Sequence, residues 1–167
     1  LCMIGTGYVG LVSGVCFSDL GNTVYCVDKD KNKIDLLNQG IVPIYEPSLE
    51  EILKRNSKQK RLIFTSDLKK AVSQSDIIFI CVGTPTKKNT NSADLKYVFK
   101  VVRELKKIIS KYKIIVTKST VPVTTGDKIE KILLQLKKKN LVDVVSNPEF
   151  LREGEAINDF SRPDRVI

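Results

Sequence analysis

The chain has 167 residues, of which 42% are hydrophobic and 28% are charged, a composition typical of a globular domain with a sizeable core. This composition excludes collagen, a coiled coil, a disordered chain and a disulfide scaffold, and no apolar run approaches the roughly 18 residues that would span a bilayer. The formal net charge of +9 would suit an anionic partner, but the lysine clusters lack the interleaved aromatic residues of a nucleic-acid binder. We interpret them as solvated surface and expect neither nucleic acid nor a membrane as a partner.

Strand-like and helix-like segments alternate along the chain. Expected strands cover residues 1–4, 23–27, 62–64, 76–82, 112–117 and 142–146. Expected helices cover residues 9–20, 31–38, 49–54, 67–72, 93–109 and 125–136. Ser48 and Glu51 are predicted to form a capping box, and Ser66 or Asp67 is predicted to cap the fourth helix.

This alternation predicts an α/β fold, a doubly wound and mostly parallel sheet of the Rossmann type. The run 76–82 is apolar without interruption, as in a parallel strand that is covered on both faces. Residues 1–147 are expected to form this domain. Residues 148–167, where the pattern becomes irregular, are expected to begin a substrate-binding or linking segment.

Four cysteines lie far apart in apolar runs, and the chain has no histidine. They are Cys2, Cys16, Cys26 and Cys81. Because their spacing is not that of metal ligands, no metal site is expected. Buried free thiols fit a reducing compartment, so a cytoplasmic location is expected. Both ends of the chain interrupt strand-like runs, which predicts that it belongs to a longer protein.

A glycine fingerprint, Gly5-x-Gly7-x-x-Gly10, follows the first expected strand and opens the first expected helix. Gly5 would permit a tight turn, Gly7 would admit a pyrophosphate, and Gly10 would let helix and strand pack closely. The second expected strand ends at Asp28, whose carboxylate would accept hydrogen bonds from the ribose hydroxyls of NAD and repel the extra phosphate of NADP. Two lysines beside Asp28 could receive that phosphate. The alternative is a loop whose glycines serve packing alone.

Three polar loops follow the later expected strands, at residues 82–85, 118–122 and 147–153. Ligands of open α/β sheets bind beyond the carboxyl ends of the strands, so these loops together form a candidate site. Ordinary turn chemistry is the alternative for any one of them.

These segments together resemble the UDP-glucose/GDP-mannose dehydrogenase family, and its UDP-glucose branch in particular. The resemblance rests on IGTGYVGLVSG, VDKDKNKI, IYEPSLEE, VGTP, ADLKYV, KSTVPV and NPEFLREGEAINDFSRPDRVI, which run in family order from residue 4 to 167. There are three departures. Ser48 and Thr124 stand where the family usually has glycine, and the loop 87–92 lacks a glycine that relatives often carry.

The resemblance implies NAD as cofactor and UDP-glucose as substrate. The C6 alcohol would be oxidised to the carboxylate of UDP-glucuronate while two NAD molecules are reduced in succession. None of the four cysteines stands in the family's catalytic motif, so the nucleophile is expected beyond residue 167, in a protein that is a homodimer when full length. The alternatives are GDP-mannose or a UDP-N-acetyl-hexosamine as substrate, a non-catalytic NAD-binding module, and a nucleic-acid binder.

The resemblance also assigns roles to individual residues. Cofactor contacts fall to Gly5, Gly7, Tyr8, Val9, Gly10, Asp28, Lys33, Thr84, Pro85, Thr120 and Glu153. Substrate contacts fall to Glu149, Phe150, Leu151, Arg152 and Glu153. Two of these are expected to be catalytic: Thr120 would help hold the attacking water, and Glu149 would orient or deprotonate it. A solvated helix-face lysine is the alternative for Lys33, and a surface or helix-capping carboxylate is the alternative for Glu149.

Overall fold

The computed structural model describes residues 1–88, 92–134, 141–148 and 150–163. The strands are β1 (Cys2–Ile4), β2 (Val24–Val27), β3 (Leu62–Thr65), β4 (Ile77–Ile80), β5 (Lys113–Thr117) and β6 (Val142–Ser146). The helices are α1 (Tyr8–Asp19), α2 (Lys31–Asn38), α3 (Leu49–Lys58), α4 (Leu68–Ser73), α5 (Lys96–Ile108), α6 (Thr125–Leu133) and α7 (Ala156–Ser161).

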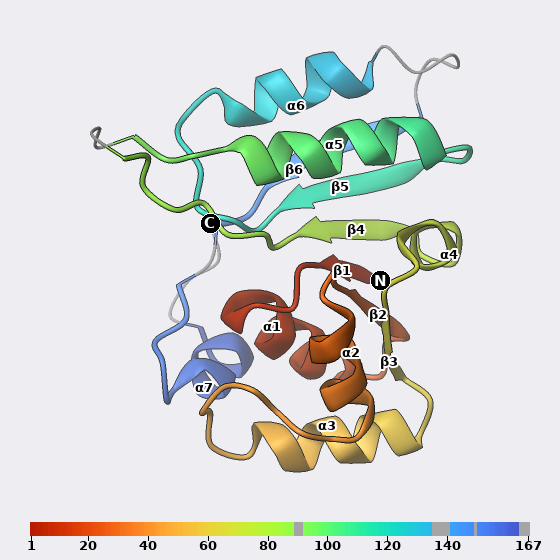
Figure 1. The fold of residues 1–167 in the computed structure, drawn as a ribbon, viewed down its shortest axis with the longest axis vertical. Helices are drawn as coiled ribbons and strands as arrows, with labels where there is room; N and C mark the ends of the chain where they lie inside the picture. Colours follow the sequence, from red (N-terminus) through yellow and green to blue (C-terminus); the bar gives the residue numbers. More distant parts are fainter. Residues whose placement is uncertain (89–91, 135–140, 149, 164–167) are drawn as a thin grey trace.

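The strands form one parallel sheet in the order β3-β2-β1-β4-β5-β6 (Figure 1). The order reverses between β1 and β4, as in a doubly wound dinucleotide-binding fold. The fold class predicted from the sequence is therefore confirmed.

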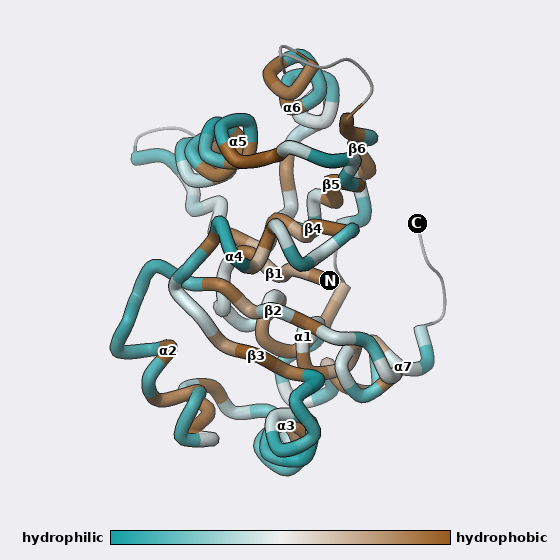
Figure 2. Tube along the Cα trace, turned by 90° about the vertical axis from the view of Figure 1, so that its right-hand side faces the viewer, coloured by the Kyte–Doolittle hydropathy of each residue, from teal (hydrophilic) through white to brown (hydrophobic). Residues whose placement is uncertain are grey.

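Alternate strand residues face two separate cores. In β1, Met3 joins one cluster, whereas Cys2 and Ile4 join the other. The first cluster is completed from α1, α2, α3 and α7, and the second from α4, α5 and α6. Figure 2 shows the apolar strands between helices, of which α3 and α5 are hydrophilic on the side away from the sheet. Burial on both faces explains why the central strands are apolar without alternation.

Two helix starts differ from the prediction. Ser48 precedes α3 in the left-handed region, at φ 63°, and makes no side-chain hydrogen bond to the helix, so the predicted capping box is wrong. The fifth helix begins at Lys96 rather than at Ala93 or Asp94. Ala93 instead pairs with Thr86 in an isolated bridge, and the Asp94 amide donates to the Pro85 carbonyl at 2.7 Å, so tertiary hydrogen bonds hold both residues outside the helix.

Other boundaries lie close to those predicted. Asp67 caps α4, accepting from the Lys70 amide at 2.9 Å, as one of the two predicted caps. Helix α3 continues past the expected residue 54 to Lys58. In this added part Asn56 is fully buried and donates a hydrogen bond to Asp19 of α1. Residues 135 and 136 of the sixth expected helix lie outside the described residues.

Residues 150–163 fold back onto α1, although their sequence showed no regular pattern. The Phe160 ring of α7 meets Phe17 of α1 edge-on, with 4.9 Å between the centroids. Leu151 and Ile157 pack against the same core cluster. The segment with the expected substrate contacts therefore lies beside the helix that begins at the glycine loop (Figure 1).

Ser48 and Thr124 both adopt left-handed backbone conformations, with φ of 63° and 71°. These are the two positions where the family usually has glycine. A side chain in this region costs about 1–2 kcal/mol, and the β-branched Thr124 is the more strained. Glycine would adopt this conformation without strain at both positions. This chain instead has strained residues where the turns enter α3 and α6.

Thr124→Gly is expected to stabilise the protein by about 1 kcal/mol, since relief of strain exceeds the entropy that glycine adds to the unfolded chain. Ser48→Gly should give a smaller gain. Thermal unfolding of the full-length protein should show Tm raised by about 1–2 °C for Thr124→Gly, because the entropy of unfolding grows with chain length. Lys128→Gly, at an exposed site within α6, is the matched control and should lower Tm. A Thr124→Gly protein no more stable than wild type would contradict the strain.

No helix in the described parts of the chain combines the length and the apolar character needed to cross a membrane.

Candidate functional site

The three glycines of the glycine loop differ in how much room they leave for a side chain. Gly5 has φ +104°, and a Cβ there would lie 2.8 Å from the carbonyl oxygen of Cys81. A Cβ on Gly10 would collide with the carbonyl oxygen of Gly5 and lie 2.9 Å from the Cβ of Cys81. A Cβ on Gly7 would meet nothing within 4 Å. The loop thus packs tightly at its ends and stays open at its centre, as a site for a pyrophosphate requires.

Helix α1 begins at this opening. Gly7 is its N-cap and offers no side-chain hydrogen bond, and the first turn, which includes Tyr8 and Val9, contains no acidic residue. An uncapped helix start presents backbone N–H groups and the positive end of the helix dipole. An anion is the ligand that these features favour.

Asp28 lies at the end of β2 beside the same loop. Its Oδ2 accepts from the Thr6 amide at 3.0 Å, from the Thr6 hydroxyl at 2.8 Å and from Lys33 Nζ at 3.4 Å, while Oδ1 accepts from the Asp30 amide at 3.1 Å. The Asp28 side chain is 14% exposed. The carboxylate is therefore fixed in orientation and still reachable by a ligand.

These contacts keep Asp28 ionised. Burial alone would raise the pKa of Asp28, but the hydrogen bonds from Thr6 and Asp30, together with the Lys33 ammonium, outweigh it and hold the pKa below its usual value. A fixed carboxylate at the end of the second strand is the group that receives ribose hydroxyls in dinucleotide-binding folds.

A cavity of about 410 Å³ opens between the ends of β1, β2 and β4 and the helices α4 and α5. Its lining comprises Ile4, Gly5, Gly7, Val27, Asp28, Lys29, Lys33, Ser66, Leu68, Cys81, Val82, Gly83, Tyr97, Lys100, Val101 and Glu104. The cavity thus joins the glycine loop to Asp28 and continues to an apolar wall with charged residues at its rim.

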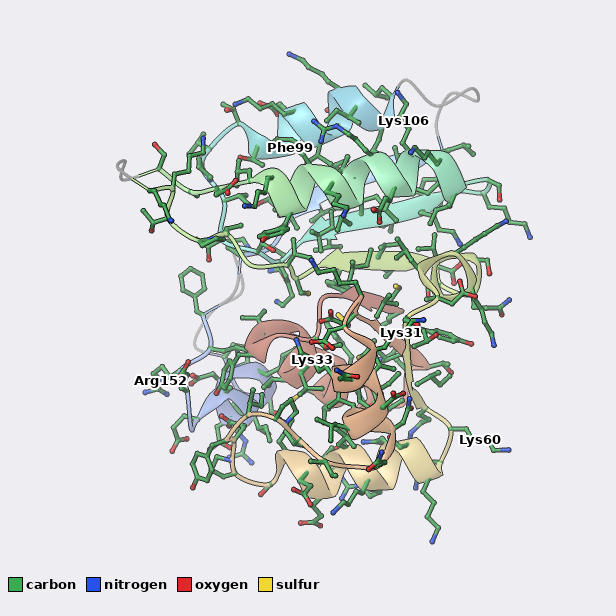
Figure 3. The ribbon with its side chains drawn as sticks, viewed as in Figure 1. Lys31, Lys33, Lys60, Phe99, Lys106 and Arg152 are labelled. Carbon is green, nitrogen blue, oxygen red and sulfur yellow. The ribbon has the colours of Figure 1, made fainter. Side chains whose placement is uncertain are left out.

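Lys33 lines this cavity from α2, with a side chain that is 31% exposed and an ammonium close to Asp28. Figure 3 shows Lys33 turned toward the middle of the molecule, whereas Lys60 extends away from it. The alternative of a freely solvated lysine does not fit this placement.

Thr6 and Tyr97 are residues of the cavity region that sequence reasoning did not assign to the site. Thr6, which is buried and holds Asp28, occupies a variable position of the fingerprint, so no pattern marked it. Tyr97 lines the cavity from the first turn of α5, with Lys29 Nζ 5.3 Å and Lys96 Nζ 4.9 Å from its ring centroid. The signal that could have found Tyr97 was its place in the ADLKYV stretch.

The three strand-end loops are joined to one another. Ser119 Oγ donates to the carbonyl of Val82 at 2.6 Å, and Thr84 Oγ1 donates to the carbonyl of Thr120 at 2.9 Å. The buried Lys118 reaches Asn147 Oδ1 at 3.2 Å. The structure therefore brings together Thr84, Pro85 and Thr120, which the sequence placed at separate strand ends.

The expected substrate residues are placed unequally. Glu149, an expected catalytic residue, lies outside the described residues. Phe150 is exposed and Leu151 packs against the core, while Glu153 is exposed. The Arg152 guanidinium pairs with Asp159 of α7, with Nη2 2.6 Å from Oδ1 and Nε 3.1 Å from Oδ2, and the Arg152 amide donates to the same carboxylate at 2.9 Å.

The four cysteines are buried and form no disulfide. Burial raises the pKa of Cys2 to about 12 and raises that of Cys26 well above its usual value. These two thiols therefore stay protonated near neutral pH and are poor nucleophiles.

The model of the UDP-glucose/GDP-mannose dehydrogenase family, NAD binding domain, matches residues 1–167, which is the whole chain. The chain belongs to this family. The resemblance read from the sequence motifs is confirmed. NAD is the cofactor, and the open centre of the glycine loop, the uncapped start of α1 and the fixed Asp28 carboxylate all fit it.

Some relatives in the family are named for UDP-glucose, and another is named for GDP-mannose. The chain is 53% identical over 167 residues to a UDP-glucose 6-dehydrogenase of Rhizobium meliloti, covering 100% of this chain and 38% of the relative. It is 49% identical over 168 residues to the UDP-glucose 6-dehydrogenase TuaD of Bacillus subtilis, covering 100% and 36%. A ternary complex of GDP-mannose dehydrogenase from Pseudomonas aeruginosa superposes with a TM-score of 0.93 at 43% identity, covering 99% of this chain and 39% of that one. The chain thus spans less than two-fifths of these family members.

Proposed function

We propose that this chain is the NAD-binding part of an enzyme that oxidises UDP-glucose to UDP-glucuronate. The observation that carries the proposal is 53% identity along the whole chain to a UDP-glucose 6-dehydrogenase. The geometry supports it, because the NAD site and three joined polar loops occupy the same edge of the sheet, where a nucleotide sugar would meet the cofactor.

Each part of the cofactor site has a role in this proposal. The start of α1, with Gly7 and Val9, would hold the pyrophosphate, and Asp28 would hold the adenosine ribose with Lys33 beside it. Gly5 and Gly10 keep the loop in place. Thr84 and Pro85 would flank the cofactor, and Glu153 would lie on its nicotinamide side. When bound, NAD accepts hydride from C6 of the sugar.

The substrate side of the proposal uses residues 149–153 and Thr120. Thr120 would help hold the water that attacks the covalent intermediate, and Glu149 would orient or deprotonate it. The nucleophilic cysteine is proposed to lie outside this chain, in keeping with the burial of all four cysteines here. Residues 1–147 would form the NAD-binding domain, and 148–167 would begin the segment that binds substrate.

A cytoplasmic location is part of the proposal, since four reduced and buried cysteines fit a reducing compartment. The homodimer of the full-length protein stays a prediction.

A second candidate is the same oxidation of GDP-mannose. The observation in its favour is the TM-score of 0.93 to a GDP-mannose dehydrogenase. A UDP-N-acetyl-hexosamine is less favoured, since the UDP-N-acetyl-mannosamine dehydrogenase Cap5O of Staphylococcus aureus is 25% identical with a TM-score of 0.86.

The test is NADH production by the full-length protein with UDP-glucose, GDP-mannose and a UDP-N-acetyl-hexosamine offered separately. Two NADH per UDP-glucose are expected, because oxidation of an alcohol to a carboxylate removes two hydrides, and little turnover is expected with the other sugars. Turnover of GDP-mannose alone would transfer the assignment to the second candidate. NAD binding without turnover of any sugar would indicate a non-catalytic NAD-binding module.

A further inference from the structure

Glu46 is a buried carboxylate in a loop, 8% exposed, between α2 and α3. It belongs to the IYEPSLEE stretch, which the proposed chemistry does not use. A buried carboxylate is costly unless hydrogen bonds satisfy it, so its partners indicate why it is there.

Within the part of the chain that the structure describes, the hydrogen-bond partners of Glu46 come from two other segments. Its Oε2 accepts from the Tyr8 hydroxyl and from the Gly154 amide at 2.9 Å, and its Oε1 accepts from the Ile157 amide at 3.3 Å. The Tyr8 hydroxyl also lies 3.3 Å from the carbonyl oxygen of Arg152 and 3.2 Å from the Gly154 amide.

These contacts connect two parts of the site that are far apart in sequence. Tyr8 is the first residue of α1, whose start faces the open centre of the glycine loop. Gly154 follows directly on the segment 150–153, which is expected to contact the sugar, and Ile157 lies a little further on, in α7. Tyr8 therefore turns its side chain toward the substrate segment, while its backbone lies at the helix start.

We propose that Glu46 is a positioning residue that fixes segment 150–157 against the start of α1 and thereby sets the placement of the sugar relative to NAD. The part of the inference that concerns the sugar rests on the proposed function. The link between the two segments rests on the hydrogen bonds alone. Correct orientation of the reacting groups lowers the barrier of the chemical step. A misplacement of these groups by about 1 Å can lower the rate by about 100-fold. Loss of the Glu46 contacts should therefore lower kcat more than it weakens binding of NAD.

The test uses Glu46→Ala, Glu46→Gln and Tyr8→Phe in the full-length protein. Glu46→Gln keeps the size and one acceptor oxygen, so its effect should lie between wild type and Glu46→Ala, and it keeps the test open if the alanine variant does not fold. For Glu46→Ala and Tyr8→Phe we expect kcat to fall at least about tenfold, while the Kd of NAD measured without sugar changes by less than about twofold. The double variant Tyr8→Phe/Glu46→Gln should be less impaired than the product of the two single effects, because both remove one network.

Asn56→Ala is the matched control, because Asn56 links α3 to the other end of α1 by donating to Asp19 Oδ1 at 3.0 Å. It should lower Tm and leave kcat unchanged. If Asn56→Ala lowered kcat as much as the Glu46 variants, or if Glu46→Ala folded with wild-type kcat, the positioning role would be wrong.

Amide hydrogen exchange separates this inference from the proposed function, since it needs no turnover. In the Glu46 variants the amides of Gly154 and Ile157 should exchange at least about tenfold faster, with α5 unaffected. Unchanged exchange would overturn the link whatever the enzyme oxidises. Faster exchange in a protein that oxidises no sugar would leave the link standing and refute the proposed function.

Discussion

Gly10→Ala is expected to destabilise the protein by about 3 kcal/mol or more and to abolish NAD binding. The new Cβ would collide with the carbonyl oxygen of Gly5 and lie 2.9 Å from the Cβ of Cys81, so the backbone of the loop would have to move away from the strand. Backbone atoms cannot yield as the end of a flexible side chain does. Thermal unfolding and NAD titration of the full-length protein measure the two losses.

Gly7→Ala is the matched comparison at the centre of the same loop. Gly7 has φ −70°, which alanine adopts without strain, and its Cβ would meet nothing within 4 Å. The free protein should be as stable as wild type or more so by up to about 1 kcal/mol, because alanine reduces the entropy of the unfolded chain. NAD affinity should nevertheless fall at least about tenfold, since the methyl group occupies the space where the pyrophosphate approaches. Wild-type NAD affinity in Gly7→Ala would place the pyrophosphate elsewhere.

The second large effect is expected at Asp28. Asp28→Asn should shift the preference between NAD and NADP by about 100-fold toward NADP, because hydrogen bonds to a charged group contribute about 1.5–3 kcal/mol and a repelling charge is removed. Lys29, Lys33 and Lys100 line the same cavity and would then attract the extra phosphate. The measurement is the Kd of each cofactor. Lys60→Gln, a change of charge on an exposed lysine outside the cavity lining, is the control and should leave the ratio unchanged.

The lowered pKa of Asp28 predicts the pH range of this effect. A carboxylate whose folded-state pKa lies below its unfolded value contributes stability that is complete above the unfolded pKa, about 3.9, and is lost as pH falls through the folded pKa. The contribution of Asp28 to NAD affinity and to stability should therefore stay level from pH 8 to about 5 and fall below about pH 4. Asp28→Asn lacks this contribution, so its stability should converge on that of wild type at low pH. A difference that stayed constant with pH would contradict an ionised Asp28.

The sequence predicted a cofactor site because the signals for it are local. A glycine fingerprint between a strand and a helix, followed by Asp28 at the end of the next strand, depends on the chain directions of one β-α-β unit. The alternation of apolar runs and helical periodicity likewise predicted six strands and most of the helices. Such patterns repeat every two or 3.6 residues and need no knowledge of distant neighbours.

The same reasoning failed where distant groups compete with local preference. Ser48 and Glu51 match a capping box, but the turn entering α3 holds Ser48 at positive φ. Ala93 and Asp94 have the composition of a helix start, but hydrogen bonds to the loop after β4 keep them outside α5. In both places a tertiary constraint overrides a local preference of about 1 kcal/mol.

By itself, therefore, the sequence determined the doubly wound fold and NAD as cofactor, and it predicted the ribose contact of Asp28, since short-range periodicity and turn chemistry carry that information. Only the tertiary structure decided that Thr6 donates hydrogen bonds to Asp28, that Tyr97 lines the cavity, and that Glu46 accepts from both Tyr8 and Gly154. Glu46 and Gly154 are 108 residues apart. Contacts at that separation follow from how helices pack on a twisted sheet, and no local pattern encodes which polar groups then meet.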